Sequence, residues 1–160
     1  MKIYLDTEFI ERPNTIELIS IGLIREDGKE YYAISSEFNP DNASLWVKEN
    51  VLDILEADVP RKSIETIRNE ILAFTDDLKK EKIEFWGYFP SYDWVVFCWI
   101  FGTMEKLPAN YPKYCLDLKQ EMHKMGVKRH TLPSHDAVKH NALEDAKWHK
   151  KVFDFLFPSN

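Results

Sequence analysis

The sequence of 160 residues predicts an α/β fold with one central mixed sheet flanked by helices. Two observations support this expectation: strand-like segments fill residues 3–34, and helical patterns interrupted by one further strand follow them. The apolar content of 44% is typical of a chain of this length that buries one core, so we expect a single domain over residues 1–160.

Three strands are expected at the start of the chain. Residues 3–5 alternate and stop at an acidic pair, which predicts a short first strand. Residues 16–24 are almost continuously apolar and rich in β-branched side chains, which predicts an interior strand. Asp27-Gly28 predicts a two-residue hairpin turn with the returning strand over residues 31–34, so the second and third strands should be antiparallel.

The period of the apolar residues then changes to that of a helix. A short amphipathic helix is expected over residues 46–55, and a longer one over residues 64–78, where apolar side chains recur at spacings of three and four. These helices lead to a fourth strand at residues 83–86. A crossover of this length favours a strand parallel to the first.

Three more helices are expected in the remainder of the chain. Residues 92–101 are apolar nearly all round, which predicts a buried helix that Gly102 ends. Residues 115–125 fit a helix between two loops, and residues 142–157 predict a terminal helix with one apolar face. The loop before this last helix, residues 126–140, is rich in Lys, Arg and His.

The charge distribution limits the classes of function. The net charge of -6 excludes a protein that coats nucleic acid or anionic membrane by bulk positive charge. The charge is uneven, with 12 basic and 21 acidic side chains in residues 1–112 against 9 and 6 in residues 113–160. Two cysteines are too few for a disulfide framework, and no segment resembles a signal peptide or a membrane span. We therefore expect a soluble, cytoplasmic protein without a membrane partner.

Acidic residues stand at the predicted ends of separate elements. Asp6 and Glu8 follow the first strand and, by alternation, point to the same face, so that both can reach one cation. The alternative is a solvated strand end. Asp93 begins the most apolar helix between two aromatic residues, where it is either a metal ligand or an N-terminal cap.

A histidine and a carboxylate mark the start of the terminal helix. Asn141 and Glu144 resemble a capping box that begins the helix at Ala142 and leaves His140 on the preceding loop. From the loop, the His140 ring can turn over Asp145 in the first helical turn. The alternative is a capping pair with an incidental histidine.

The four carboxylates together indicate a metal site more strongly than any one of them does alone. Hard oxygen ligands without a Cys or His cluster suit Mg²⁺ or Mn²⁺ rather than structural zinc. Two such ions about 4 Å apart clamp the attacking and leaving oxygens of a phosphodiester, and a nearby histidine can take the proton from the attacking water.

Three motifs resemble those of a known family. Asp6-Thr7-Glu8-Phe9, Tyr92-Asp93 and His140-x-Ala142-x-x-Asp145 are similar, in order and spacing, to the motifs of the DEDDh branch of RNase H-like 3'-5' exonucleases. Within that branch the chain looks most like the bacterial RNase AS-type, polyadenylate-specific exoribonucleases, with RNase T and oligoribonuclease as more distant relatives. The resemblance implies an RNase H-like mixed sheet of five strands flanked by helices.

The resemblance also implies a role for each matching residue. Asp6 would bridge two Mg²⁺ ions, for which Mn²⁺ would substitute, and Glu8 and Asp145 would complete the tighter of the two sites. Asp93 would hold the second ion directly or through water. His140 would be the general base, because the sister branch places a tyrosine at the next position, where this chain has an asparagine.

Candidate substrate contacts lie beside these motifs. The resemblance places Thr7 and Phe9 at the terminal nucleotide, and Trp46 and Trp86 are further residues on which a base can stack. The basic loop offers contacts to phosphate, principally Arg129 and His135, with Lys128, His130 and Lys139 beside them. The alternatives are aromatic residues of an ordinary core and a merely solvated loop. Many relatives carry an asparagine where this chain has Phe89, which puts one hydrogen bond near the substrate in doubt.

The sequence therefore predicts a metal-dependent 3'-5' exoribonuclease that hydrolyses single-stranded RNA to 5'-mononucleotides, and its relatives imply a homodimer. The same chemistry on DNA is one alternative, because the choice depends on contacts to the 2'-hydroxyl. A binding module without catalysis is another, although none of the four acids is lost. An HD-type phosphohydrolase built on His135-Asp136 would need an all-helical bundle, which the strand-rich first third argues against.

Overall fold

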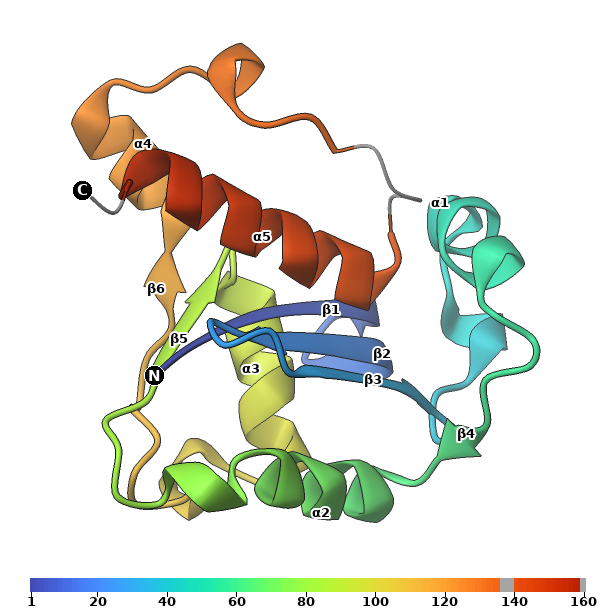
Figure 1. Ribbon diagram of the computed structural model, residues 1–160. Coiled ribbons are helices and arrows are strands. Elements are labelled where there is room, and N and C mark those ends of the chain that lie inside the picture. Colours follow the sequence, from blue (N-terminus) through green and yellow to red (C-terminus); the bar gives the residue numbers. More distant parts are fainter. Residues whose placement is uncertain (136–139, 159–160) are drawn as a thin grey trace.

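A computed structural model describes residues 1–135 and 140–158. One mixed sheet with the strand order β4-β3-β2-β1-β5-β6 forms the middle layer of the molecule (Figure 1). The strands are β1 (Lys2–Arg12), β2 (Thr15–Arg25), β3 (Glu30–Ser35), β4 (Arg61–Lys62), β5 (Glu84–Gly87) and β6 (Leu116–Asp117).

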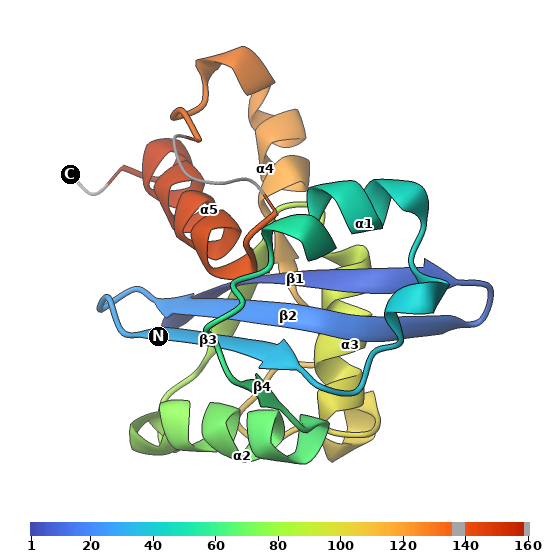
Figure 2. The same cartoon turned by 90° about the vertical axis from the view of Figure 1, so that its right-hand side faces the viewer.

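Helices cover both faces of this sheet. The α-helices are α1 (Leu45–Asn50), α2 (Ile64–Phe74), α3 (Ser91–Ile100), α4 (Leu118–Met125) and α5 (Ala142–Leu156). Helices α1, α4 and α5 lie on one face, and α2 and α3 lie on the other (Figures 1 and 2). Among the described residues, no helix is both long and apolar enough to cross a membrane.

The α/β class is confirmed, but the expected count of five strands is wrong. The described residues form six strands, because β4 pairs with the end of β3 and β6 pairs with the end of β5. Both added strands are two residues long, and two residues show no period in a sequence. The expected parallel crossover is confirmed, since β5 pairs with β1 in parallel, and the antiparallel pairing of β2 with β3 is confirmed too.

The first strand is much longer than its sequence indicates. β1 continues through the acidic pair, with Asp6 opposite Gly22 and Glu8 opposite Ser20 on β2. The pairing then skips Ile19, which produces a bulge next to Glu8. The two carboxylates therefore lie inside a strand and not at its end. Backbone pairing with β2 holds this segment extended whatever its side chains are.

Alternation along β1 decides which helices face the carboxylates. Ile3 and Leu5 belong to the core that α2 and α3 cover, whereas Tyr4 belongs to the core beneath α4 and α5. Since successive side chains point to opposite faces, Asp6 and Glu8 share the face of Tyr4. The acidic pair is therefore directed toward α5.

Two helices differ in extent from the expectation. α2 ends at Phe74, because the backbone of Thr75 leaves the helical conformation, with φ of −112° and ψ of 10°, and the chain continues in a 3₁₀ turn. α4 begins only at Leu118, where the Asp117 side chain accepts a hydrogen bond from the N–H of Lys119 and caps the helix.

Two further local expectations are corrected. The hairpin after β2 has only Gly28 at positive φ, and its N–H bonds the Arg25 carbonyl, so the loop is longer than two residues. α3 is not buried all round, because one side of it exposes Tyr92, Val95 and Trp99.

The start of α5 is confirmed at Ala142. The Asn141 side chain accepts hydrogen bonds from the N–H groups of Leu143 and Glu144, which is the expected cap. This first turn lies directly on Gly22 of β2, where a Cβ atom would overlap the backbone of Ala142 and Leu143. Because Gly22 is opposite Asp6 on the neighbouring strand, this close contact brings the helix start over the acidic pair.

The variant Gly22→Ala tests this contact. The added methyl group would push α5 away from the sheet, and we expect a loss of about 1–3 kcal/mol in the free energy of unfolding, with weaker binding of Mg²⁺. Urea unfolding and calorimetric titration with Mg²⁺ measure the two effects. Gly28→Ala is the control, because its cost comes only from positive φ in an open turn, and it should leave Mg²⁺ binding unchanged. Unchanged stability and Mg²⁺ binding in Gly22→Ala would contradict the role of this contact.

Candidate active site

The site is built on a stretch of β1 that its neighbour leaves unpaired. Pairing between β1 and β5 ends one residue before Leu5. Beyond that point the Leu5 carbonyl bonds Nδ1 of His149 at 2.9 Å, and the Thr7 N–H bonds the Asp93 carboxylate at 3.0 Å. Buried backbone groups need hydrogen-bond partners, and here side chains from α5 and α3 provide them.

Asp93 is fixed by Thr7. It is the third residue of α3 and 9% exposed, and its Oδ1 accepts hydrogen bonds from the N–H and, at 2.6 Å, from the hydroxyl of Thr7. No side chain caps this helix, whose N-cap residue is Pro90, so the alternative of an N-terminal cap is wrong. Thr7 is itself buried, and its hydroxyl is directed to Asp93.

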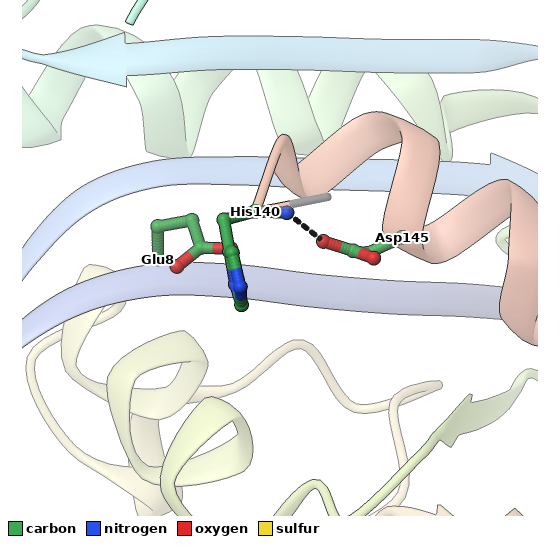
Figure 3. A group of neighbouring side chains, drawn as sticks. All are labelled: Glu8, His140 and Asp145. Atoms are coloured by element: carbon green, nitrogen blue, oxygen red, sulfur yellow. Dashed lines mark hydrogen bonds and ion pairs between the residues drawn. The ribbon is translucent and has the colours of Figure 1, made fainter. Parts of the chain in front are cut away.

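Asp145 receives hydrogen bonds from the segment that precedes its own helix. The backbone N–H of His140 bonds Oδ2 at 2.9 Å (Figure 3). On the other oxygen, Nε2 of His135 lies 2.6 Å from Oδ1. The Asp145 side chain is 18% exposed and lines the same cleft as the acidic pair on β1.

His140 stands over Glu8. Its backbone has φ of 64°, a conformation that non-glycine residues rarely adopt and that often marks functional sites. Its Nδ1 lies 3.8 Å from Oε1 of Glu8, and its ring meets the ring of Trp46 edge to face with centroids 5.0 Å apart. A loop histidine is thus turned over the carboxylates, as the capped start of α5 predicted.

One cleft of 290 Å³ collects these residues. Its lining consists of Asp6, Thr7, Glu8, Phe9, Tyr88, Asp93, Arg129, His135, His140, Asp145, Trp148 and His149. The four acids and the histidine singled out in the sequence therefore meet in one place. They come from β1, α3 and α5, elements that are far apart along the chain.

The carboxylates of the cleft carry uncompensated negative charge. Burial, and after it the charges of Asp93, Glu8 and Asp145, raise the pKa of Asp6 well above its usual value. Burial and the charges of Asp145 and Asp93 raise the pKa of Glu8 to about 8. Burial raises the pKa of Asp93 to about 6, although the hydrogen bonds that it accepts from Thr7 act to lower it. Among residues 1–135 and 140–158, no Lys or Arg forms an ion pair with any of the four acids.

The donor set fits a hard divalent cation. Ligand atoms of Glu8, His140 and Asp145 lie within 4.8 Å of one another, and Asp6 and Asp93 line the same cleft. Most of these donors are carboxylate oxygens, which Mg²⁺ and Mn²⁺ prefer. A cation here would neutralise the repulsion that raises the pKa values of the carboxylates.

The predicted substrate residues lie either at the rim of the cleft or around a second hollow beside it. Arg129 lies over the rings of Tyr88 and Trp148, at 5.4 and 5.3 Å from their centroids, and so holds a guanidinium at the rim. Lys128 and His130 are exposed and do not line the cleft. Lys139, and Asp136 of the alternative HD pair, lie outside the described residues.

A second hollow adjoins the cleft on the side of Glu8. It has a volume of 390 Å³ and is lined by Glu8, Phe9, Ile10, Glu11, Ser44, Trp46, Val47 and Val51. Trp46 is 55% exposed there, whereas Phe9 packs on Tyr92 with ring centroids 5.8 Å apart. Trp86 is buried beneath α5 and offers no face to a base, so it belongs to the core. Phe89 has φ of 65° and is exposed.

Sequence reasoning missed three residues that line the cleft, Tyr88, Trp148 and His149. Burial lowers the pKa of His149 to about 4, so this ring is neutral near pH 7. The signal for His149 was its position four residues after Asp145, which places both on one face of α5. Tyr88 and Trp148 gave no signal, because aromatic residues at such positions are typical of an ordinary core.

The chain matches known exoribonucleases over almost its full length. The family model for the 3'-5' exoribonuclease Rv2179c-like domain matches residues 1–157. Two Mycobacterium tuberculosis proteins, the 3'-5' exoribonuclease MT2234.1 of strain CDC 1551 / Oshkosh and the 3'-5' exoribonuclease Rv2179c of strain H37Rv, are each 39% identical over 149 residues. Each alignment covers 92% of this chain and 88% of the relative.

The fold and the match define the class of the protein, which is a 3'-5' exoribonuclease and thus a hydrolase. Within that class, the chain belongs to the family of Rv2179c-like 3'-5' exoribonuclease domains.

The raised pKa of Glu8 predicts a stability that falls with pH when metal is removed. A carboxyl group whose pKa rises from 4.5 to about 8 on folding holds its proton more tightly in the folded state. The contribution of Glu8 to the free energy of unfolding should therefore be largest below a pH of about 4.5 and fall as the pH rises to about 8. Glu8→Gln should reduce this fall by roughly 1–3 kcal/mol, measured by urea unfolding in chelator at several pH values.

The matched control is Glu65→Gln on the exposed side of α2, which should keep the wild-type pH dependence. Saturating Mg²⁺ should remove the loss at high pH in the wild-type protein, because the cation binds the ionised carboxylates. An identical pH slope in Glu8→Gln and wild type would contradict this account of the cleft.

Proposed function

We propose that the chain is a metal-dependent 3'-5' exoribonuclease of the DEDDh type, similar to the RNase AS-type enzymes, that releases 5'-mononucleotides from single-stranded RNA. The observation that supports this most strongly is the meeting of Asp6, Glu8, Asp93 and Asp145 with His140 in one cleft. Within residues 1–135 and 140–158 no Lys or Arg pairs with these acids, so the convergence of four carboxylates from three distant motifs has no structural reason of its own. We propose that residues 1–160 act as one exonuclease domain.

The four carboxylates would hold two Mg²⁺ ions, with Mn²⁺ as a substitute. When bound, two such ions stabilise the negative charge that develops on the phosphate oxygens during hydrolysis. Asp6 is central for this role, because the negative charges of Asp93, Glu8 and Asp145 all raise the pKa of its carboxyl group. Thr7 acts indirectly, since its two bonds to Asp93 fix the orientation of that carboxylate.

His140 would be the general base. Its ring lies on a loop at the mouth of the acidic cluster, with Nδ1 near Glu8, and a base there can take a proton from a water that attacks the terminal phosphodiester. The edge of Trp46 packs against the ring and limits its rotation. His135 would support the site from the other side through Asp145.

The terminal nucleotide would occupy the hollow beside Glu8. Phe9 and Trp46 line it, and an exposed aromatic face stacks on any base at about 1–3 kcal/mol per base. Arg129, held on the two aromatic rings at the opposite rim, would contact the phosphate of the strand entering the cleft. Exposed Phe89 stands where many relatives have an asparagine, and stacking would replace a hydrogen bond there.

RNA is favoured over DNA because the relatives are named exoribonucleases. The module that binds without catalysis is disfavoured because every expected acid lines the cleft. The HD alternative is disfavoured by the mixed sheet. The homodimer, the cytoplasmic location and the preference for polyadenylate stay predictions.

End-labelled RNA and DNA oligonucleotides of mixed and homopolymer sequence test the proposed function. With Mg²⁺ or Mn²⁺ we expect RNA to shorten from its 3' end and chelator to stop the reaction; shortening of adenosine homopolymers alone would reveal the base preference. Asp6→Ala and Asp145→Ala should reduce turnover to background while circular dichroism shows an intact fold. The control Asp154→Ala, on the exposed part of α5, should keep full activity. Full activity in either acid variant would refute the metal site, and DNA shortening at an equal rate would refute the preference for RNA.

A separate variant tests the general base. His140→Ala should lower the turnover rate by about 10²–10⁴-fold, because proton transfer from a positioned side chain contributes about that much. Single-turnover kinetics on an RNA oligonucleotide measures the chemical step directly. His123→Ala, an exposed histidine on α4, is the matched control and should leave the rate unchanged. A rate for His140→Ala within threefold of wild type would remove His140 from this role.

A further inference from the structure

His149 is a buried histidine of the cleft to which no motif assigns a role. It lies one helical turn after Asp145 on α5, is 4% exposed, and its ring packs over Tyr88 with centroids 6.2 Å apart. A buried imidazole normally has partners for both ring nitrogens. The two nitrogens of His149 have very different surroundings.

The hydrogen bond of Nδ1 fixes the tautomer of the ring. Nδ1 lies 2.9 Å from the carbonyl oxygen of Leu5, and a carbonyl oxygen can only accept, so the proton is on Nδ1. In a neutral imidazole one ring nitrogen is the donor and the other is the acceptor. Nε2 therefore carries a lone pair and acts as an acceptor.

This lone pair is directed toward the acidic cluster without a protein donor. Nε2 lies 3.8 Å from Oδ1 of Asp6, and within residues 1–135 and 140–158 no donor forms a hydrogen bond with it. At 3.8 Å the two atoms are too far apart to form a hydrogen bond with each other. Since no donor of the described residues bonds Nε2, a water molecule is the smallest donor that can reach both atoms.

We propose that His149 is a positioning residue of the metal site whose Nε2 accepts a hydrogen bond from the hydration water of the cation bound at Asp6. The inference rests on the proposed function. Mg²⁺ keeps several of its waters in proteins and prefers oxygen ligands, so a water is a better neighbour for it than an imidazole nitrogen. The hydrogen bond from Nδ1 of the same ring to the Leu5 carbonyl joins α5 to β1 and keeps Asp145 close to Asp6.

The tautomer and its response to metal can be observed directly by nitrogen NMR. In protein labelled with ¹⁵N-histidine, the His149 signals are assigned by their loss in His149→Gln. We expect the neutral ring to carry its proton on Nδ1, and we expect Mg²⁺ titration to shift Nε2 much more than Nδ1. A proton on Nε2 in the metal-free protein, or an unchanged Nε2 signal at saturating Mg²⁺, would overturn the inference.

Metal affinity provides the second measurement. His149→Leu should bind Mn²⁺ about 10–100-fold more weakly than wild type in calorimetric titration, since partners outside the direct ligands contribute about that much. His149→Gln should stay within threefold of wild type, because its amide can donate to Leu5 and its oxygen can accept from water. His123→Gln is the matched control and should bind as wild type does.

The outcomes separate this inference from the proposed function. Wild-type protein without affinity for Mn²⁺ would overturn the proposed function and this inference together. Normal Mn²⁺ binding by wild type and by a folded His149→Leu would overturn the role of His149 alone. If unfolding curves show that His149→Leu does not fold, a loss of affinity in His149→Gln as large as 10-fold would overturn it as well.

Discussion

The unpaired edge of β1 is the feature on which the rest of the site depends. Where β5 stops pairing, a carbonyl and an N–H are left in a buried position, and each would be costly without a partner. The partners are His149 from α5 and Asp93 from α3. The hydrogen bonds that satisfy the backbone of β1 therefore also orient two side chains of the cleft. The same contacts stabilise the fold and position groups for the chemistry.

The cleft is electrostatically unfavourable without a cation, and the surrounding fold tolerates this. The raised pKa values of Asp6, Glu8 and Asp93 describe carboxylates held closer together than their charges prefer. The apolar cores on both faces of the sheet hold the three elements in place against this repulsion.

The sequence allowed much of this arrangement to be predicted, and the exceptions have physical reasons. The start of α5 was predictable because Asn141 is a strong local signal, and the convergence of the acids followed from the motifs. The extension of β1 was not, since Asp6 and Glu8 face a cleft and break the apolar pattern of the strand. His149 was not predicted, because a buried histidine on the inner face of an amphipathic helix has the same pattern as a core residue.

The bond between Leu5 and His149 joins residues 144 positions apart. Asp6 and Glu8 lie early in the sequence and Asp145 lies late, so the cleft is complete only when α5 has packed on β1. This contact closes a long loop, and long loop closures slow the folding of a domain. The order in which the parts of the cleft form is therefore set by the docking of α5, after the strands that carry the acidic pair have paired.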